Sequence, residues 1–178
     1  PYHALGEAGA NAAREAEAAP EQVAKIIVSR PGMKNLTGPL HPKNLIDMAH
    51  SPAYFTAAGV RDHQFGWIHA SQEKIDDPVI HTLIDKVTVG PEPTENLAAY
   101  RQGATVAIEM TDGRTVANTV FVPTGAGCVG IDWADVDEKC YALMPAAPLD
   151  DVKIESALSK VRQFRTLGHA SELTDHLA

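Results

Sequence analysis

Hydrophobic and polar residues alternate most clearly in the second half of the chain. The alternation holds over residues 104–110 and again over residues 115–122, and the polar segment 111–114 separates the two runs. A period of two places every second side chain on the same face of a β-strand. Because the separating segment contains a two-residue Asp-Gly turn signal, the pattern predicts a β-hairpin.

The start of the chain has a different pattern. Residues 4–19 are rich in Ala, Glu and Arg, which favour helix, and Pro20 ends the run. Because nearly all its apolar residues are Ala, this helix is only weakly amphipathic, and we expect it to pack closely against another helix or subunit. The other expected elements are strands over 25–29 and 86–89 and helices over 52–60, 77–85, 132–144, 149–165 and 171–176.

Strands and helices do not alternate regularly in this order. Regular alternation is typical of parallel α/β folds, whereas segregated strands and helices are typical of α+β folds. We therefore predict an α+β fold with a small, mostly antiparallel sheet of about four strands packed with helices. No internal repeat or low-complexity linker is present, so we expect one domain over residues 1–178.

Composition and charge narrow the class of protein. The chain of 178 residues has 44% hydrophobic and 21% charged residues, ordinary values for a globular protein. The net charge of −8 argues against nonspecific binding to nucleic acid or to an anionic membrane. Cys128 and Cys140 lie in no metal-ligand spacing, no apolar run approaches the roughly 20 residues of a membrane span, and no signal peptide opens the sequence. We therefore expect a reduced, cytoplasmic protein.

Residues 50–54, His-Ser-Pro-Ala-Tyr, are the most informative candidate site. Ser51 is a natural N-cap, and Pro52 is favoured at the first helical position. A helix N-terminus carries free backbone N–H groups and a partial positive charge, which suit a carboxylate or phosphate. His50, Ser51 and Tyr54 would together hold an anionic substrate and offer it a proton. The alternative is an ordinary capped helix with a half-buried tyrosine, and spacing alone favours that alternative.

Two other sequence patterns are weaker evidence for a functional site. The loop at residues 125–130 would bring backbone amides close to a ligand, but it matches neither a phosphate-binding loop nor a dinucleotide fingerprint, so a plain connection is the simpler interpretation. Asp62-His63, His69 and His81 form no compact ligand motif, so we expect no metal site. No nucleophile elbow is present, and neither cysteine lies in a motif for a catalytic nucleophile.

Several weak motifs follow one another along the chain in a specific order. They are Pro1-Tyr2-His3 with the Ala-rich helix after it, residues 47–54, residues 76–87, the turn at 111–114, and Gly125-Ala126-Gly127 followed by residues 133–139. Together these segments resemble the C-terminal domain of the MmgE/PrpD family over nearly the whole chain. The family includes 2-methylcitrate dehydratase, cis-aconitate decarboxylase and iminodisuccinate epimerase.

The resemblance implies both a fold and an activity. Family members have a large helical domain followed by a smaller α+β domain, and this chain is similar to the smaller one. They act on small di- or tricarboxylates by eliminating water, removing CO2 or epimerising a carbon next to a carboxylate, and they need no metal or organic cofactor. Abstracting a proton next to a carboxylate requires a base and stabilisation of the enolate-like charge.

The resemblance also implies roles for individual residues, in a cleft between the two domains. Tyr54 would be a proton donor or a substrate anchor, and His3 would correspond to the family histidine that follows a Lys-Pro-Tyr stretch. The expected catalytic residues are Tyr54, His50 and His3, and the expected substrate-binding residues are Ser51, Gly125 and Gly127.

Three departures from the family pattern bear on function. The sequence lacks the helical domain that supplies further active-site residues, Gly125-Ala126 stands where many members have Gly-His, and residues 61–66 replace a Leu-Asp-Gly turn. We therefore expect a small subunit or fragment that is inactive alone and binds a helical MmgE/PrpD N-terminal-like partner, in a hetero-oligomer built from dimers. One alternative is a noncatalytic regulatory or scaffolding subunit that keeps the fold. Another is a hydratase-like or hydrolytic enzyme that acts on a non-citrate substrate.

Overall fold

The computed structural model describes residues 2–127, 130–144, 147 and 149–175. The chain divides into two compact units, Pro1–Gly130 and Ile131–Ala178, and each is described by itself. The expectation of a single domain over residues 1–178 stays a prediction.

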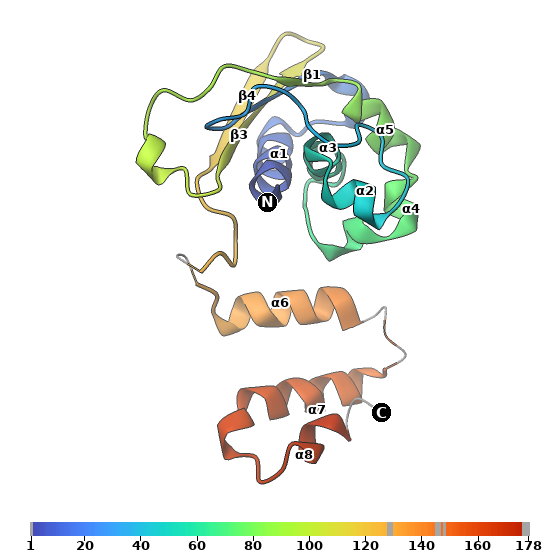
Figure 1. The fold of residues 1–178 in the computed structure, drawn as a ribbon. Helices are drawn as coiled ribbons and strands as arrows, with labels where there is room; N and C mark the ends of the chain where they lie inside the picture. The colour runs from blue at the N-terminus through green and yellow to red at the C-terminus, as the bar shows by residue number, and fades with distance from the viewer. Residues whose placement is uncertain (1, 128–129, 145–146, 148, 176–178) are drawn as a thin grey trace. The chain divides into compact units, whose positions relative to one another are not determined.

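A four-stranded sheet forms one layer of the first unit (Figure 1). Its order is β2–β1–β3–β4, and Ile26 in β1 pairs with Val87 in β2 on one side and with Ile108 in β3 on the other. The β1–β2 pair is parallel, while β1–β3 and β3–β4 are antiparallel. The α+β prediction with about four mostly antiparallel strands is confirmed. The strands are β1 (Val23–Ser29), β2 (Val87–Val89), β3 (Ala104–Met110) and β4 (Thr115–Val120).

The predicted hairpin joins β3 to β4, but its connection is longer than the expected Asp-Gly turn. Met110 N donates to Arg114 O at 2.8 Å, and Gly113 N donates to Met110 O at 3.0 Å, so three residues lie between the paired positions. Gly113 adopts φ +89°, a left-handed conformation that glycine reaches without strain. A turn followed by a left-handed glycine fits the right-handed twist of the strands, which explains the extra residue.

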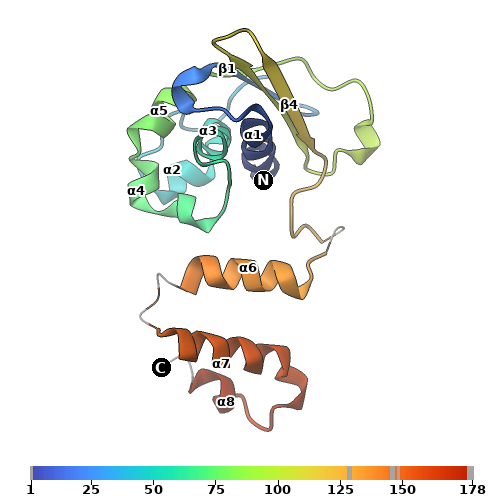
Figure 2. The same cartoon turned by 180° about the vertical axis from the view of Figure 1, so that it is seen from behind.

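One helix makes the main contact with the sheet, and the other helices of this unit pack beside or beyond it. α1 (His3–Ala16) packs against β3 and β4, and α3 (Pro52–Asp62) lies beside α1 (Figures 1 and 2). Five of the short elements, α2, α4 and the turns η1, η2 and η3, were not expected from the sequence. The remaining helices and turns of this unit are η1 (Pro20–Gln22), α2 (Leu45–Ala49), η2 (Trp67–Ala70), α4 (Gln72–Ile75), α5 (Pro78–Ile84) and η3 (Leu97–Ala99).

Small residues bring α1 and α3 into backbone contact. A Cβ atom on Gly59 would lie 2.1 Å from the carbonyl oxygen of Gly6, and one on Gly9 would lie 3.0 Å from that of Thr56. The alanines of α1 that face this contact and the sheet are buried. The expected close packing of the Ala-rich helix against another helix is therefore confirmed.

The second unit is helical, as predicted. It comprises α6 (Trp133–Leu143), α7 (Asp151–Arg162), the turn η5 (Phe164–Thr166) and α8 (Ser171–Thr174). The Tyr141 hydroxyl donates to Glu155 Oε1 at 2.5 Å, and Arg162 pairs with Asp137, so α6 is bonded to α7. The end of the expected tail helix, at His176, lies outside the described residues.

Candidate functional site

Ser51 caps α3 as the sequence predicts. Its hydroxyl oxygen accepts the Tyr54 backbone N–H at 3.2 Å and donates its own proton to Leu40 O at 3.4 Å. Pro52 occupies the first helical position, where the lack of an N–H costs nothing. The expected helix entry is therefore confirmed, and its cap is tied to the loop that precedes α2.

That loop, residues 30–44, covers the entry of α3. Ser51 and the first turn of the helix are buried. Gly38 has φ +73°, and a Cβ atom there would lie 2.0 Å from His50 O, so only glycine allows this approach. Within this unit, the N-terminal turn of α3 faces protein atoms rather than solvent.

His50 is the exposed member of the predicted constellation. Its Nδ1 lies 2.8 Å from the carbonyl oxygen of Ile46, one turn earlier in α2. A carbonyl only accepts hydrogen bonds, so Nδ1 carries a proton. In a neutral imidazole with that tautomer, Nε2 keeps its lone pair and is able to act as a base.

Tyr54 lies inside the unit. Its side chain is fully buried, and its hydroxyl donates to the carbonyl oxygen of His69 at 2.8 Å. Burial, followed by the negative charges of Asp62, Asp77 and Asp76, raises the pKa of Tyr54 above its ordinary value. The phenol therefore keeps its proton and uses it in a bond within the protein.

His3 is exposed at the start of α1, beside the start of α3. Its ring lies edge-on to Phe55 at 5.6 Å and to Phe65 at 6.0 Å between centroids. Tyr2 also packs edge-on against Phe55, at 5.8 Å, and its hydroxyl lies 3.4 Å from Thr37 Oγ1 in the covering loop. The structure thus brings His3 to the same end of the helix pair as His50 and Ser51.

The predicted glycines lie on an exposed loop after β4. Thr124 N donates to both carboxylate oxygens of Glu7 at 3.1 Å, and Glu7 lies one turn beyond His3 in α1. This bond holds the start of the loop near the same end of α1. Gly125 adopts φ +78°, and a Cβ atom on Gly127 would meet no atom within 4 Å. Cys128 lies outside the described residues.

The opposite end of α3 carries a charged cluster that sequence reasoning did not find. Asp62, the last residue of the helix, accepts bonds from Arg61 at 2.6 Å, from Lys74 at 2.5 Å and from His69 Nε2 at 3.1 Å. Burial alone would raise the pKa of Asp62, but the Lys74 hydrogen bond and the positive charges of Lys74 and Arg61 lower it. The carboxylate is therefore ionised at neutral pH.

His69 links this cluster to Tyr54. Its side chain is fully buried, and burial lowers its pKa despite the opposing effects of the Gly66 backbone and of Asp62. In the neutral ring, Nε2–H donates to Asp62, and Nδ1 accepts the Gly66 N–H at 3.1 Å. A sequence signal for the cluster existed in residues 61–66, which depart from the family turn, but the partners His69 and Lys74 came only from the fold.

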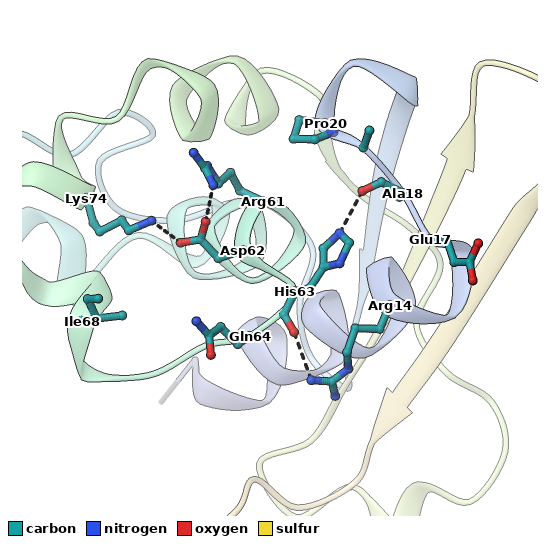
Figure 3. A pocket seen from close by; sticks show the side chains of 11 residues that line it. Arg14, Glu17, Ala18, Pro20, Arg61, Asp62, His63, Gln64, Ile68 and Lys74 are labelled. Carbon is teal, nitrogen blue, oxygen red and sulfur yellow. Dashed lines mark hydrogen bonds and ion pairs between the residues drawn. The ribbon is translucent and has the colours of Figure 1, made fainter. Parts of the chain in front are cut away.

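A pocket of about 810 Å³ opens beside the charged cluster (Figure 3). Arg14 donates to His63 O at 3.0 Å, and His63 Nε2 donates to Ala18 O at 2.8 Å, so the ends of α1 and α3 are fastened together there. The pocket lies at the other end of the helix pair from His3 and His50. It is lined by Arg14, Glu17, Ala18, Ala19, Pro20, Arg61, Asp62, His63, Gln64, Ile68 and Lys74.

The part of the chain that the structure describes offers neither a metal-binding cluster nor a membrane-spanning helix. Among residues 2–127, 130–144, 147 and 149–175, no three or more His, Cys, Asp or Glu side chains are grouped to hold a metal ion. Within the same residues, no helix has the length and apolar character to cross a membrane.

The comparison with protein families decides the family. The model of the MmgE/PrpD C-terminal domain matches residues 2–160. The chain belongs to this family. The resemblance expected from the sequence motifs is thereby confirmed. No curated protein matches the chain. In this MmgE/PrpD C-terminal domain, the matched region contains the whole first unit after Pro1 and continues into α7 of the second.

Proposed function

We propose that this MmgE/PrpD C-terminal domain supplies one wall of the active site of a cofactor-independent lyase or isomerase. The substrate class is a small di- or tricarboxylate, and the reaction begins with abstraction of a proton next to a carboxylate. The observation that carries this proposal is the position of two exposed imidazoles, His3 and His50, at the same end of α1 and α3.

The two histidines have complementary surroundings. His50 donates through Nδ1 to the Ile46 carbonyl, which leaves Nε2 as the base that takes the proton. His3 lies at the N-terminus of α1, where the helix dipole favours a negative group. A substrate carboxylate near His3 would be stabilised as enolate-like charge develops. The Gly125 and Gly127 amides, on the loop held by Glu7, are the proposed further contacts to substrate.

Ser51 and Tyr54 contribute to this site by holding the start of α3 in place. Both side chains are buried, and both are engaged in hydrogen bonds that fix the start of α3. We assign them positioning roles in this arrangement. To act as a proton donor, Tyr54 would have to release the carbonyl of His69, which burial would leave without a partner.

The other wall is proposed to come from a helical MmgE/PrpD N-terminal-like domain, on this or another chain. Leu45 and Ile46, at the start of α2 and one turn before His50, are 55% and 73% exposed. Neighbouring exposed apolar side chains mark surfaces that a partner covers. A helical domain that packs there would exclude water from His50 and close the cleft.

The test uses the complex of this chain with its helical partner, isolated from the native source by co-purification. A panel of small di- and tricarboxylates in heavy water would report proton abstraction as deuterium incorporation, followed by NMR. His50→Ala and His3→Ala should each lower the exchange rate by about 10²–10⁴-fold, the usual contribution of a general acid or base. His169→Ala, which replaces an exposed histidine of the second unit, is the matched control and should retain the rate.

A noncatalytic regulatory or scaffolding subunit is the second candidate. The buried entry of α3 and the engaged hydroxyl of Tyr54 favour it, as does Ala126 in place of the family histidine. Unchanged exchange in His50→Ala and His3→Ala, with the complex still assembled, would support this candidate and refute the catalytic one. Exchange at a full rate by the chain alone would refute the shared site.

A further inference from the structure

Two histidines outside the proposed site meet head to head. His41, in the loop at residues 30–44, and His81, on α5, place their Nδ1 atoms 2.8 Å apart. Their ring planes are inclined by only 18°, and the ring centroids are 5.1 Å apart. At these two separations, both nitrogens lie on the line that joins the rings. The in-plane lone-pair directions therefore point at each other.

The outer nitrogens of the pair are also bonded. His41 Nε2 lies 2.9 Å from Asp85 Oδ1, and His81 Nε2 lies 2.8 Å from the carbonyl oxygen of Ile75. A carboxylate and a carbonyl only accept hydrogen bonds, so each Nε2 carries a proton. The close contact between the two Nδ1 atoms requires one more proton, which lies between them. Two neutral imidazoles hold two protons, so this arrangement holds three and carries one positive charge.

The same geometry does not suit a shared metal ion. Zinc–imidazole bonds are about 2.0–2.1 Å long, which places two nitrogens in a tetrahedral site roughly 3.3 Å apart. The 2.8 Å contact is shorter, and its lone pairs face one another rather than a common point beside them. A proton between the rings fits the distance and direction.

We propose that His41 and His81 form a proton-dependent latch that ties the loop at residues 30–44 to α5. The latch is closed when the pair holds its third proton. When that proton leaves, two lone pairs face each other at 2.8 Å, and the contact is repulsive. The latch is therefore closed at low pH, where the pair keeps its third proton, and it opens as the pH rises.

The charged groups around the pair agree with this direction. Asp85, the C-cap residue that follows α5, is the carboxylate in contact with the pair and favours the cation. Asp76 at the end of α4 binds Gln72, and Asp47 on α2 binds the Asn44 side chain and Lys43 N. The positive charge of Lys43 belongs to the same loop. Ile75, whose carbonyl oxygen binds His81 Nε2, is the last residue of α4, and the C-terminal end of a helix also favours a positive charge.

The latch bears on the helix entry because of where the loop goes. Leu40, next to His41, accepts the hydroxyl of Ser51, and Gly38 lies against the backbone of His50. Opening the latch would loosen the segment that buries the start of α3. The latch does not depend on the proposed catalytic activity, and its state is measurable without turnover.

The experiment compares the full chain with His81→Asn by urea unfolding at about pH 5.5 and about pH 8.5. An exposed charged contact contributes about 0.2–1 kcal/mol, so His81→Asn should raise the unfolding constant by a factor of roughly 1.4 to 5 at the lower pH. At the higher pH the two proteins should differ less. His169→Gln, which replaces an exposed histidine of the second unit, is the control and should show no such pH dependence.

Imidazole NMR on the same proteins localises the effect. In the wild type, we expect His41 and His81 to change together in one coupled step, with backbone order parameters of residues 36–41 falling over the same pH range. In His81→Asn, the loop should lose this response. Independent titration of the two rings, or a loop that ignores pH in the wild type, would overturn the latch. So would an unfolding ratio that is equal at both pH values.

Discussion

The carboxylate of Asp62 should be the largest single electrostatic contributor to the stability of the first unit. Its side chain is 8% exposed and is shared by Arg61, Lys74 and His69. Removing one partner of a buried ion pair costs about 3–5 kcal/mol, but Arg61 and Lys74 are partly exposed and are able to turn to water. We therefore expect Asp62→Asn to lower the free energy of unfolding by about 2–3 kcal/mol at pH 7, which is at or just under the lower end of that range.

The loss should depend on pH in a definite direction. The pKa of Asp62 is lowered in the folded protein, so its charge stabilises the fold above the unfolded value near 3.9. This contribution disappears as the pH falls through the folded value. The difference between wild type and Asp62→Asn should therefore be full at pH 7 and should shrink below about pH 4.

Urea unfolding followed by tryptophan fluorescence measures this difference. The chain has two tryptophans, Trp67 in the first unit and Trp133 in the second. In a Trp133→Phe background, the signal reports on the first unit alone. Asp112→Asn is the matched control, because that exposed carboxylate also binds an arginine, Arg114, and should matter far less. An equal effect of the two variants, or a loss at Asp62 that persists in acid, would refute the reasoning.

Three further predictions follow from buried groups. Tyr54→Phe should lower the free energy of unfolding by about 1 kcal/mol in the same assay, because the His69 carbonyl loses its donor. Gly59→Ala should lower it by about 1–3 kcal/mol or more, since the added Cβ would lie 2.1 Å from Gly6 O, whereas Gly66→Ala meets no atom within 4 Å and should be close to neutral. The His69 imidazole should stay neutral in NMR spectra just below about pH 6.5, where an unfolded chain already takes up the proton, so its burial makes the free energy of unfolding decrease as the pH falls through the unfolded value.

Local patterns in the sequence correctly predicted those strands and helix ends that depend mainly on neighbouring residues. The alternation over Ala104–Met110 reappears as alternating burial along β3, and Ser51 caps α3 as its position before Pro52 indicates. The short elements α2 and α4 were missed. Their four or five residues carry too little periodicity, and contacts made by distant segments fix them.

The sequence was equally limited in predicting the candidate site, because contacts between distant segments shape it. His3 reaches Phe55 only because Gly6 and Gly59 allow the two helices to touch. The sequence does not show that these two glycines lie against each other. The motif at residues 50–54 identified the right helix entry, but it did not reveal that a loop covers that entry. Sequence spacing describes what a helix end offers, whereas burial depends on segments that fold over it.

Tyr54 connects the two ends of α3, and this governs how its substitution should be interpreted. Its hydroxyl, from the first turn, binds the carbonyl of His69, whose ring binds Asp62 at the last residue of the helix. Loss of turnover in Tyr54→Phe would therefore not by itself identify a catalytic group. Asp62 lies at the far end, so a similar loss in Asp62→Asn would indicate that both residues act by positioning His69 and the helix. A loss confined to Tyr54→Phe, with the stability of the two variants taken into account, would instead indicate that the phenol meets the substrate.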